Sequence, residues 1–315
     1  MIYRKGTKLE VTPYNFVAHQ GGLGDFIAQL PAIKYVLENH PQIEIKLWCH
    51  EYAFSFAKEL FKEYPMIVID SLNNSDGIYD ENLLARSPYV HKIQNLSMHL
   101  TDHAFLSLVG RSVEDKYKNY LELPSTDISE FNLPEKYMVI TTGFTSKTRV
   151  WNKQSVQETC DYITSIGYTP VFLGKSFTPS YKDQAIIGNF DVDLSKGISL
   201  IDKTDLFQAT SIMGKAACVI GVDNGLLHLA CMTKVPVIYA FTSVEAQHRL
   251  PYRNGIKGWN CYPIELPELE CFGCQSKMNF ADGEFSFTQC FYDDYKCISM
   301  LTSDKFIEQI KQILL

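Results

Sequence analysis

The 315-residue chain has 46% apolar and 21% charged residues and a formal net charge of −7, a composition that fits a globular protein and argues against disordered and collagen-like classes. The negative balance argues against non-specific nucleic-acid binding by the whole surface. No run approaches the ~18 apolar residues of a membrane span, and the polar first residues lack the apolar core of a signal peptide. We therefore expect a cytoplasmic protein, in the host cytoplasm if a phage encodes it.

The first third of the chain alternates short apolar strands with apolar-periodic helices. Such alternation with short connections indicates parallel βαβ units in a doubly wound sheet. Residues 71–120 are interrupted by Asn, Asp, Ser and Gly and predict no regular element. The predicted elements, in chain order, are strand 14–18, helix 24–39, strand 43–49, helix 51–63 and strand 66–69.

A segment with two prolines and several turn formers, residues 123–137, is interpreted as a linker. After it the alternation restarts, and the last predicted helix begins with a serine cap. Its apolar face carries Phe306, Ile307, Ile310 and Leu314. The predicted order is strand 137–142, helix 153–166, strand 169–173, helix 204–214, strand 217–220, helix 224–232, strand 236–241 and helix 303–314.

These elements predict an α/β protein with two doubly wound, Rossmann-like domains that face a central cleft. We place the N-terminal domain at residues 1–125 and the C-terminal domain at 126–302, with a cysteine-rich insertion at 270–298 and the final helix, 303–315, near the domain junction. Ligands of such folds bind at the carboxyl ends of the strands, so we expect the chemistry there.

The loop before the first helix has the glycines of a phosphate cradle, Gly22 and Gly24, but Asp25 occupies the helix start, where a phosphate would lie. The helix dipole favours an ionised carboxylate at that position, so Asp25 is available as a base. The alternative interpretation is an ordinary helix cap. Because two other loops carry the anion-binding features, we assign this loop to the acceptor side.

Both of these loops lie in the predicted C-terminal domain. The stretch GVDNGLLHLA, 221–230, offers backbone N–H groups at a helix start and His228 one turn later. Its alternative interpretation is a capped turn, with Asp223 as the cap and His228 as a satisfied surface residue. The stretch TTGFTSKTRVW, 141–151, offers hydroxyls and two cations, Lys147 and Arg149, which suit a diphosphate. Its alternative interpretation is a solvated basic turn.

Four cysteines near the C-terminus follow the spacing Cys271-x2-Cys274-x15-Cys290-x6-Cys297. Four thiolates at such spacing bind zinc or iron, although the second pair is wider than in a zinc ribbon. We expect a closed, structural metal site, with four reduced, partly buried thiols as the alternative. The total of nine cysteines is odd, which argues against a disulfide framework.

Taken together, GLGDFIAQLPAI (22–33), RVW (149–151), GVDNGLLHLA (221–230) and the cysteine-bearing tail resemble the heptosyltransferase family of glycosyltransferases, family 9, which has the GT-B fold. The cysteine segment is similar to the metal-binding finger of the autotransporter heptosyltransferases. This sequence departs from the family at three positions. They are Arg149 where Lys is usual, Asn152 where Pro is usual, and Asn224 where Thr or Ser is usual.

The resemblance implies an inverting transfer of a sugar, heptose by family default, from a nucleotide-diphosphate sugar, an ADP-sugar by the same default. No catalytic metal would be required. Asp25 would be the general base. The residues implied to contact the donor are Thr145, Lys147, Arg149, Asp223, Asn224, Gly225 and His228. The N-terminal domain would then be the acceptor side and the C-terminal domain the nucleotide-sugar side.

Three classes of acceptor remain open for such an enzyme: a glycan, a protein, or a modified base in DNA. The last would suit a phage enzyme, and Lys92, Arg111, Lys116 and Lys118 form a local basic concentration. A second hypothesis is a non-catalytic nucleotide-sugar-binding protein of the same fold. Asp25 distinguishes the two, because a binding module needs no base.

Overall fold

The computed structural model describes residues 14–17, 23–42, 45–49, 51–71, 98–109, 111–144, 146–176, 188–189, 192–277, 290 and 292–315. The chain forms two compact units. The first contains the described residues up to Leu121 together with Pro251–Trp259, and the second contains Glu122–Leu250 and Asn260–Leu315. The boundary expected at 125/126 thus falls just inside the second unit, and the return of the chain to the first unit at Pro251–Trp259 was not expected.

The first unit contains a parallel sheet in the order β1-β2-β3. In its register Tyr14 pairs with Ile45 and Ile45 with Ile67. The sequential strand order follows from the right-handed crossover helices between neighbouring strands. The elements are β1 (Tyr14–Val17), α1 (Leu23–Asn39), β2 (Ile45–Cys49), α2 (Glu51–Leu60), β3 (Ile67–Ser71), α4 (Leu100–Leu108), η2 (Asp115–Tyr117), β11 (Tyr252–Arg253) and β12 (Ile256–Lys257).

Helix α4 lies in the stretch for which the sequence predicted no element, and it packs against α1. The ring of Tyr35 on α1 meets the ring of Phe105 on α4 edge to face, with centroids 5.6 Å apart. Phe105 is fully buried. Burying two aromatic rings in this geometry stabilises the helix pair beyond simple area burial, which explains a helix of weak amphipathic pattern at this place.

Segment Pro251–Trp259 is held in the first unit by Tyr252. The ring of His99 stacks edge to face on Tyr252 at 4.9 Å, and the Lys118 ammonium lies 5.0 Å from the centre of the same ring. Lys118 is 5% exposed and is paired with Asp102 and Asp115, both at 2.7 Å. A buried ammonium needs such partners, so Lys118 is a structural cation of this unit.

The second unit contains a six-stranded sheet in the order β13-β10-β9-β4-β6-β8, with every neighbouring pair parallel. All residues of β4, β9 and β10 are buried, as expected for central strands covered on both faces. The sheet strands are β4 (Tyr137–Thr141), β6 (Thr169–Leu173), β8 (Ile198–Ser199), β9 (Val219–Val222), β10 (Val237–Ala240) and β13 (Cys261–Ile264), and a separate pair is β5 (Gly143–Phe144) with β7 (Gly188–Asn189).

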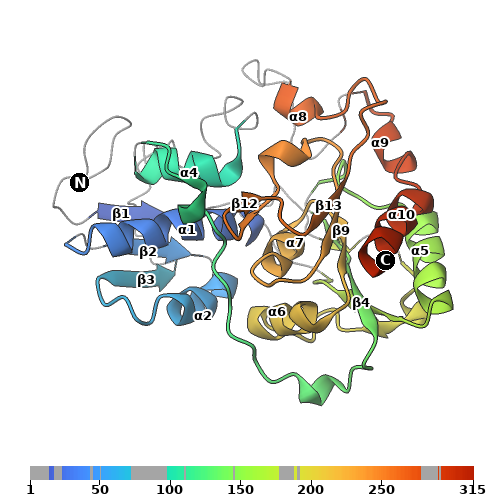
Figure 1. Cartoon of the computed structure of the whole chain (residues 1–315), viewed down its shortest axis with the longest axis horizontal. Helices are drawn as coiled ribbons and strands as arrows, with labels where there is room; N and C mark the ends of the chain where they lie inside the picture. The colour runs from blue at the N-terminus through green and yellow to red at the C-terminus, as the bar shows by residue number, and fades with distance from the viewer. Residues whose placement is uncertain are drawn as a thin grey trace. The chain divides into compact units, whose positions relative to one another are not determined.

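Helices cover both faces of this sheet: α5 and α10 lie together on one face, and α6 and α7 on the other (Figure 1). On the first face the indole of Trp151 stacks on the ring of Phe306, with centroids 3.8 Å apart and a tilt of 20°. The helices are α5 (Lys153–Ser165), α6 (Leu206–Lys215), α7 (Gly225–Ala230), α8 (Cys274–Lys277), α9 (Lys296–Ser299) and α10 (Ser303–Leu314), with short η3 (Ser129–Phe131), η5 (Leu194–Lys196) and η6 (Ala246–His248).

Helix α10 begins where the sequence predicted, but for a different reason. Thr302 occupies the N-cap position and its side chain makes no capping bond, whereas the Ser303 hydroxyl donates to Glu158 on α5. Phe306 and Ile310 are buried as predicted, while Leu314 is 41% exposed. The helix is therefore fixed by packing on α5 within the second unit.

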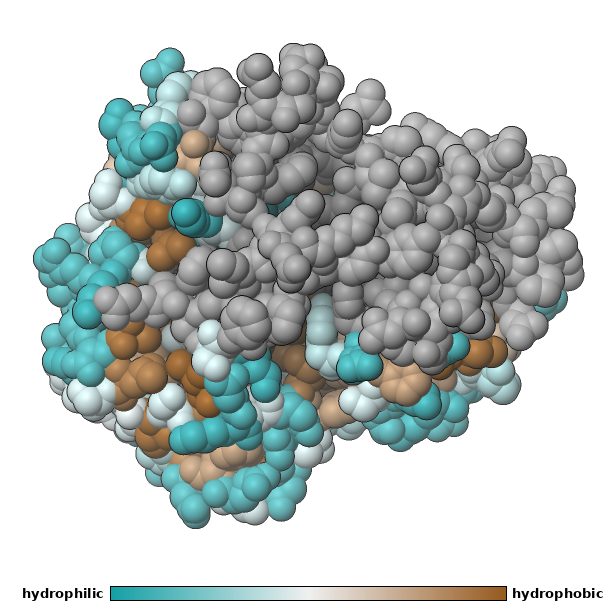
Figure 2. Space-filling model, turned by 180° about the vertical axis from the view of Figure 1, so that it is seen from behind, coloured by the Kyte–Doolittle hydropathy of each residue, from teal (hydrophilic) through white to brown (hydrophobic). Residues whose placement is uncertain are grey.

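None of the described helices is long and apolar enough to cross a membrane. On the described surface seen in Figure 2, apolar residues occur at several separate places among hydrophilic ones. Scattered apolar residues of this kind are normal for a protein surface in water.

Candidate functional site

The loop after β4 turns two of its hydroxyls inward. Ser146 and Thr148 are buried, their hydroxyl oxygens lie 2.7 Å apart, and Thr148 donates to the Ser243 hydroxyl at 3.2 Å. Both groups are thus occupied in fixing the loop. Lys147 between them is exposed. Thr145, predicted to contact the donor, lies outside the described residues.

Asp223, at the carboxyl end of β9, is the centre of a buried charge cluster. Its carboxylate Oδ2 lies 3.3 Å from Arg149 Nη1 and 3.9 Å from Arg249 Nε. Its Oδ1 lies 3.7 Å from His228 Nε2. Asp223, Arg249 and His228 are each at most 4% exposed, whereas the Arg149 side chain is 19% exposed. Arg149 therefore has the most exposed side chain of this cluster.

Burial alone would raise the pKa of Asp223, because it penalises the charged form. The Arg149 guanidinium, then His228 and Arg249, outweigh that effect and hold the pKa of Asp223 well below its usual range. The carboxylate is therefore ionised at neutral pH. Two guanidinium groups, those of Arg149 and Arg249, face this single carboxylate.

Asn224 and not Asp223 is the N-cap of α7. Its side-chain oxygen accepts from the Leu227 N–H at 3.1 Å, and its amide nitrogen donates to Thr141 Oγ1 at 3.2 Å and to the Gly143 carbonyl at 2.9 Å. Asn224 replaces the family's Thr or Ser with a residue that caps the helix and also binds β4. Gly225 is the first residue of α7.

Gly221 allows β9 to approach β4 closely. A Cβ atom at this position would lie 2.1 Å from Thr141 Oγ1 and 3.2 Å from the Thr141 carbonyl oxygen. Only glycine fits such an approach. The close contact brings Thr141 within reach of Asn224, and so ties the two loops that the sequence assigned to the donor.

A third segment also reaches Arg149. Gln275, the residue after Cys274, accepts a hydrogen bond from Arg149 Nη2 at 3.2 Å and is 1% exposed. Its backbone N–H donates to the Ser243 carbonyl at 2.8 Å. The sequence offered no signal for either Gln275, in the single-turn helix α8, or Arg249, in the loop after η6, because their positions follow from tertiary packing.

Asp25 lies in the first turn of α1, as predicted. Its side chain is half-buried and its carbonyl accepts from Gln29 Nε2 at 3.1 Å. Gly24 is buried beside it, while Gly22 lies outside the described residues. Gln29 is 2% exposed, and its Oε1 has no hydrogen-bond partner among the described residues.

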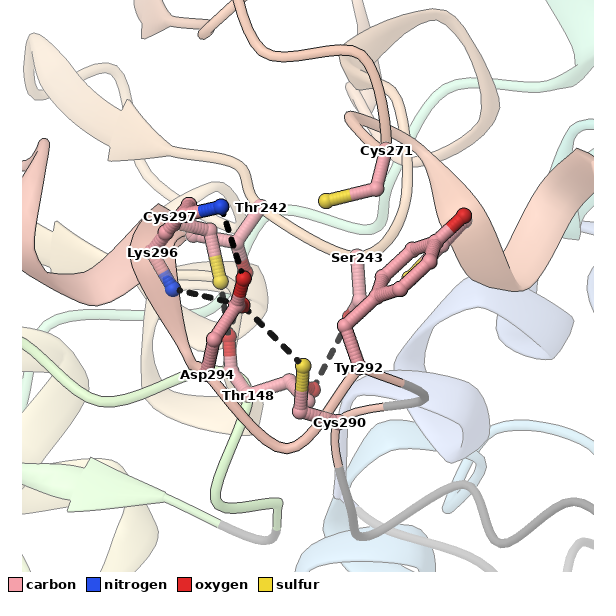
Figure 3. A pocket seen from close by; sticks show the side chains of 10 residues that line it. Thr148, Thr242, Ser243, Cys271, Cys290, Tyr292, Asp294, Lys296 and Cys297 are labelled. Carbon is pink, nitrogen blue, oxygen red and sulfur yellow. Dashed lines mark hydrogen bonds and ion pairs between the residues drawn. The ribbon is translucent and has the colours of Figure 1, made fainter.

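The four C-terminal cysteines line one pocket together with Thr148, Thr242, Ser243, Tyr292, Asp294 and Lys296. Figure 3 shows the sulfur atoms of Cys271, Cys290 and Cys297 directed into it. Asp294 pairs with Lys296 at 3.0 Å. All nine cysteines are among the described residues and none forms a disulfide.

Burial raises the pKa of Cys297 to about 12, and the neighbouring Cys290, Cys274 and Cys271 add to the shift. Within the described part of the chain, no group of three or more His, Cys, Asp or Glu side chains is arranged to hold a metal ion. The expected tetrahedral site is thus not formed, although its four cysteines share a pocket.

The model of glycosyltransferase family 9, the heptosyltransferases, matches residues 86–279. This is more than half of the chain. The chain belongs to glycosyltransferase family 9. It is a glycosyltransferase, and the matched range contains Arg149, Asp223, His228 and Gln275, whereas Asp25 lies before it. No curated protein sequence matches the chain.

Solved structures share the fold at low sequence identity. The iron-containing dodecameric glycosyltransferase TibC of enterotoxigenic E. coli is 16% identical, with a TM-score of 0.67 over 98% of this chain and 78% of its own. A TibC structure in complex with ADP-D-β-D-heptose gives 0.69 over 98% and 77%, also at 16% identity. A family 9 protein from Veillonella parvula is 14% identical, with a TM-score of 0.63 over 98% of both chains. These likenesses support the GT-B fold.

Most of the predicted basic concentration has acidic or hydroxyl partners. Lys118 is buried between two carboxylates, Lys116 pairs with Glu114 at 2.9 Å, and Arg111 donates to the Tyr35 hydroxyl at 3.4 Å. Lys92 lies outside the described residues. The carboxylates offset the charges of Lys118 and Lys116, which lowers the attraction of these two cations for phosphate.

Proposed function

We propose that this family 9 enzyme transfers a sugar from a nucleotide-diphosphate sugar to an acceptor hydroxyl, with inversion at the anomeric carbon. The observation that carries the proposal is the cluster around Asp223. One buried carboxylate faces two guanidinium groups, and the Arg149 side chain reaches the surface at the end of β4. A fixed guanidinium at a partly desolvated site suits a diphosphate.

In the proposed reaction the bond between the anomeric carbon and the diphosphate oxygen breaks, and the acceptor oxygen forms the new bond to that carbon. Negative charge develops on the leaving nucleoside diphosphate. Arg149 stabilises this charge, which lowers the barrier because the interaction strengthens in the transition state. Lys147, exposed on the same loop, is proposed to add a second contact to the phosphates, and Gly225 and His228 to contact the donor beside them.

Asp25 is proposed to take the acceptor proton. It is half-buried in the first turn of α1, where the helix dipole stabilises an ionised carboxylate. Asp25→Asn should reduce kcat by at least a hundredfold, which is the usual contribution of a general base, and leave donor affinity unchanged. Turnover at the wild-type rate would exclude Asp25 as the base and favour a different residue.

The donor is proposed to be an ADP-sugar, because a related structure contains ADP-D-β-D-heptose. Calorimetric titration with ADP, GDP and UDP, followed by assays of nucleoside diphosphate release from the matching sugar nucleotides, tests this. Arg149→Ala should weaken binding of the preferred nucleotide without abolishing it, because Lys147 is proposed to contact the phosphates as well. The absence of binding by any of the three would refute the donor site and with it the proposed transfer.

The cysteine pocket is proposed to bind a structural metal ion. Four cysteines that line one pocket are the ligand type of zinc or iron sites, and a related enzyme is iron-containing, although their described arrangement does not form a metal site. Cys271, Cys274, Cys290 and Cys297 would hold the ion, which would crosslink the segments that carry them. Elemental analysis of the purified protein and of Cys271→Ser and Cys290→Ser variants tests this. The absence of stoichiometric zinc or iron in the wild type would leave four reduced thiols as the correct interpretation.

A further inference from the structure

We infer that Gln275 is a positioning residue for the donor-binding Arg149. The inference deepens the proposed function and rests on it. Arg149 Nη2 donates to Gln275 Oε1 at 3.2 Å, and Arg149 Nη1 lies 3.3 Å from Asp223 Oδ2. The two terminal nitrogens of one guanidinium are therefore held by two different acceptors.

Two acceptors restrict the orientation of the Arg149 side chain more than a single acceptor would. An arginine side chain has about 2 kcal/mol of rotamer entropy to lose when it binds a ligand, and a guanidinium fixed in advance loses less of it. The Asp223 contact alone leaves the guanidinium free to pivot about one edge. The Gln275 contact removes that freedom, and Arg149 Nε is buried without a hydrogen-bond partner among the described residues, so it supplies no other anchor.

The neutral amide has a second advantage over a carboxylate. Arg149 already faces one carboxylate, that of Asp223, and a second anion at position 275 would further weaken the attraction of its guanidinium for a diphosphate. A glutamine oxygen accepts the hydrogen bond and leaves the charge in place. The site thus orients Arg149 with one charged and one neutral acceptor.

Gln275 is itself well fixed. It is 1% exposed, and its backbone N–H donates to the Ser243 carbonyl at 2.8 Å while that of Gly273 donates to the Thr242 carbonyl at 3.0 Å. Thr242 in turn donates to the Thr148 carbonyl at 2.6 Å, one residue before Arg149. The segment after Cys271 and the Arg149 loop are therefore anchored to the same two residues beyond β10.

A double-mutant cycle tests the inference, with the dissociation constant for the nucleoside diphosphate that the wild type binds, expected to be ADP, as the readout. Gln275→Met keeps the volume and removes the acceptor. We expect it to raise the dissociation constant about tenfold and to raise KM for the donor more than it lowers kcat. In an Arg149→Ala background the same substitution should change the dissociation constant by less than twofold, because its effect acts through Arg149.

The matched control is Gln312→Ala, which removes an exposed glutamine of α10 and should leave the constant unchanged. If Gln275→Met does not fold, as judged by circular dichroism, Gln275→Leu replaces it in the cycle. Additive effects of the two substitutions would overturn the inference while leaving the donor site intact. An unchanged dissociation constant in Arg149→Ala would instead refute the proposed donor site.

Discussion

Asn152 donates hydrogen bonds to the carbonyls of both Ile298 and Leu301, each at 3.0 Å. Its side-chain oxygen accepts from the Ser155 N–H at 2.9 Å, which makes it the N-cap of α5. One side chain therefore caps the helix after the Arg149 loop and ties it to the chain between α9 and α10. A proline, which the family usually has here, offers none of these bonds.

Asn152→Ala should lower the free energy of unfolding by roughly 2–3 kcal/mol, about 1 from the lost cap and the rest from the two lost bonds. Asn152→Ser keeps a capping oxygen and loses the amide donor to both carbonyls, so it should cost less than alanine. Urea unfolding of the three proteins measures the difference. Equal costs for alanine and serine would mean that the cap contributes nothing here.

Phe306→Ala should destabilise the second unit by roughly 3–5 kcal/mol, because a fully buried aromatic ring stacked on Trp151 is replaced by a cavity. The control is Leu314→Ala on the same helix, where the side chain is 41% exposed and the cost should stay below about 0.5 kcal/mol. Thermal unfolding followed by tryptophan fluorescence distinguishes the two. Similar melting temperatures for both variants would contradict the packing of α10 on α5.

Asp223→Asn should destabilise the protein at neutral pH by roughly 3–5 kcal/mol, since it leaves Arg149 and Arg249 without their buried counter-charge. The folded-state pKa of Asp223 is depressed. Its contribution is therefore complete above the unfolded-state pKa of about 4 and is lost as the pH falls toward the folded-state value. The stability difference between wild type and variant should be constant above about pH 5 and narrow below about pH 4. A difference that grows on acidification would contradict the ionised carboxylate.

Gly221→Ala should cost roughly 1–3 kcal/mol, because its Cβ would lie 2.1 Å from Thr141 Oγ1. Thr141→Ala removes that oxygen, so the double variant should be more stable than the two single costs predict. Chemical denaturation of the four proteins in this cycle gives the coupling energy. If the two costs in unfolding free energy are strictly additive, the strain of the new Cβ is relieved by a shift other than at Thr141.

The alternation of strands and helices could be predicted from sequence because burial on both faces leaves apolar runs. The strand 169–173 and the start of α5 at Lys153 agree with the structure to the residue. Helix α4 was missed because its position depends on an aromatic contact with α1, and β13 because an edge strand such as CYPI carries a proline and only one buried residue.

The site residues also divide into those that the sequence identified and those that it did not. Arg149, Asp223 and His228 were selected from loops at strand ends, and the structure brings these three together. Ser146, Thr148 and Asn224, on the loops assigned to the donor, make local hydrogen bonds in the structure. Arg249 lies in a loop and Gln275 in the short helix α8, and no sequence pattern marks either, so only the folded structure brings them to Asp223 and Arg149.

The path of the chain through Pro251–Trp259 also limits how the enzyme can be taken apart. A contiguous fragment that begins at Glu122 carries Tyr252 with it but leaves behind its ring neighbour His99 and the buried Lys118. A fragment that ends at Leu121 keeps Lys118 and loses the aromatic face that covers it. Cutting between the units therefore removes packed surface from both products, and a separately produced C-terminal half should be less soluble than the intact chain unless residues 251–259 are replaced by a polar loop.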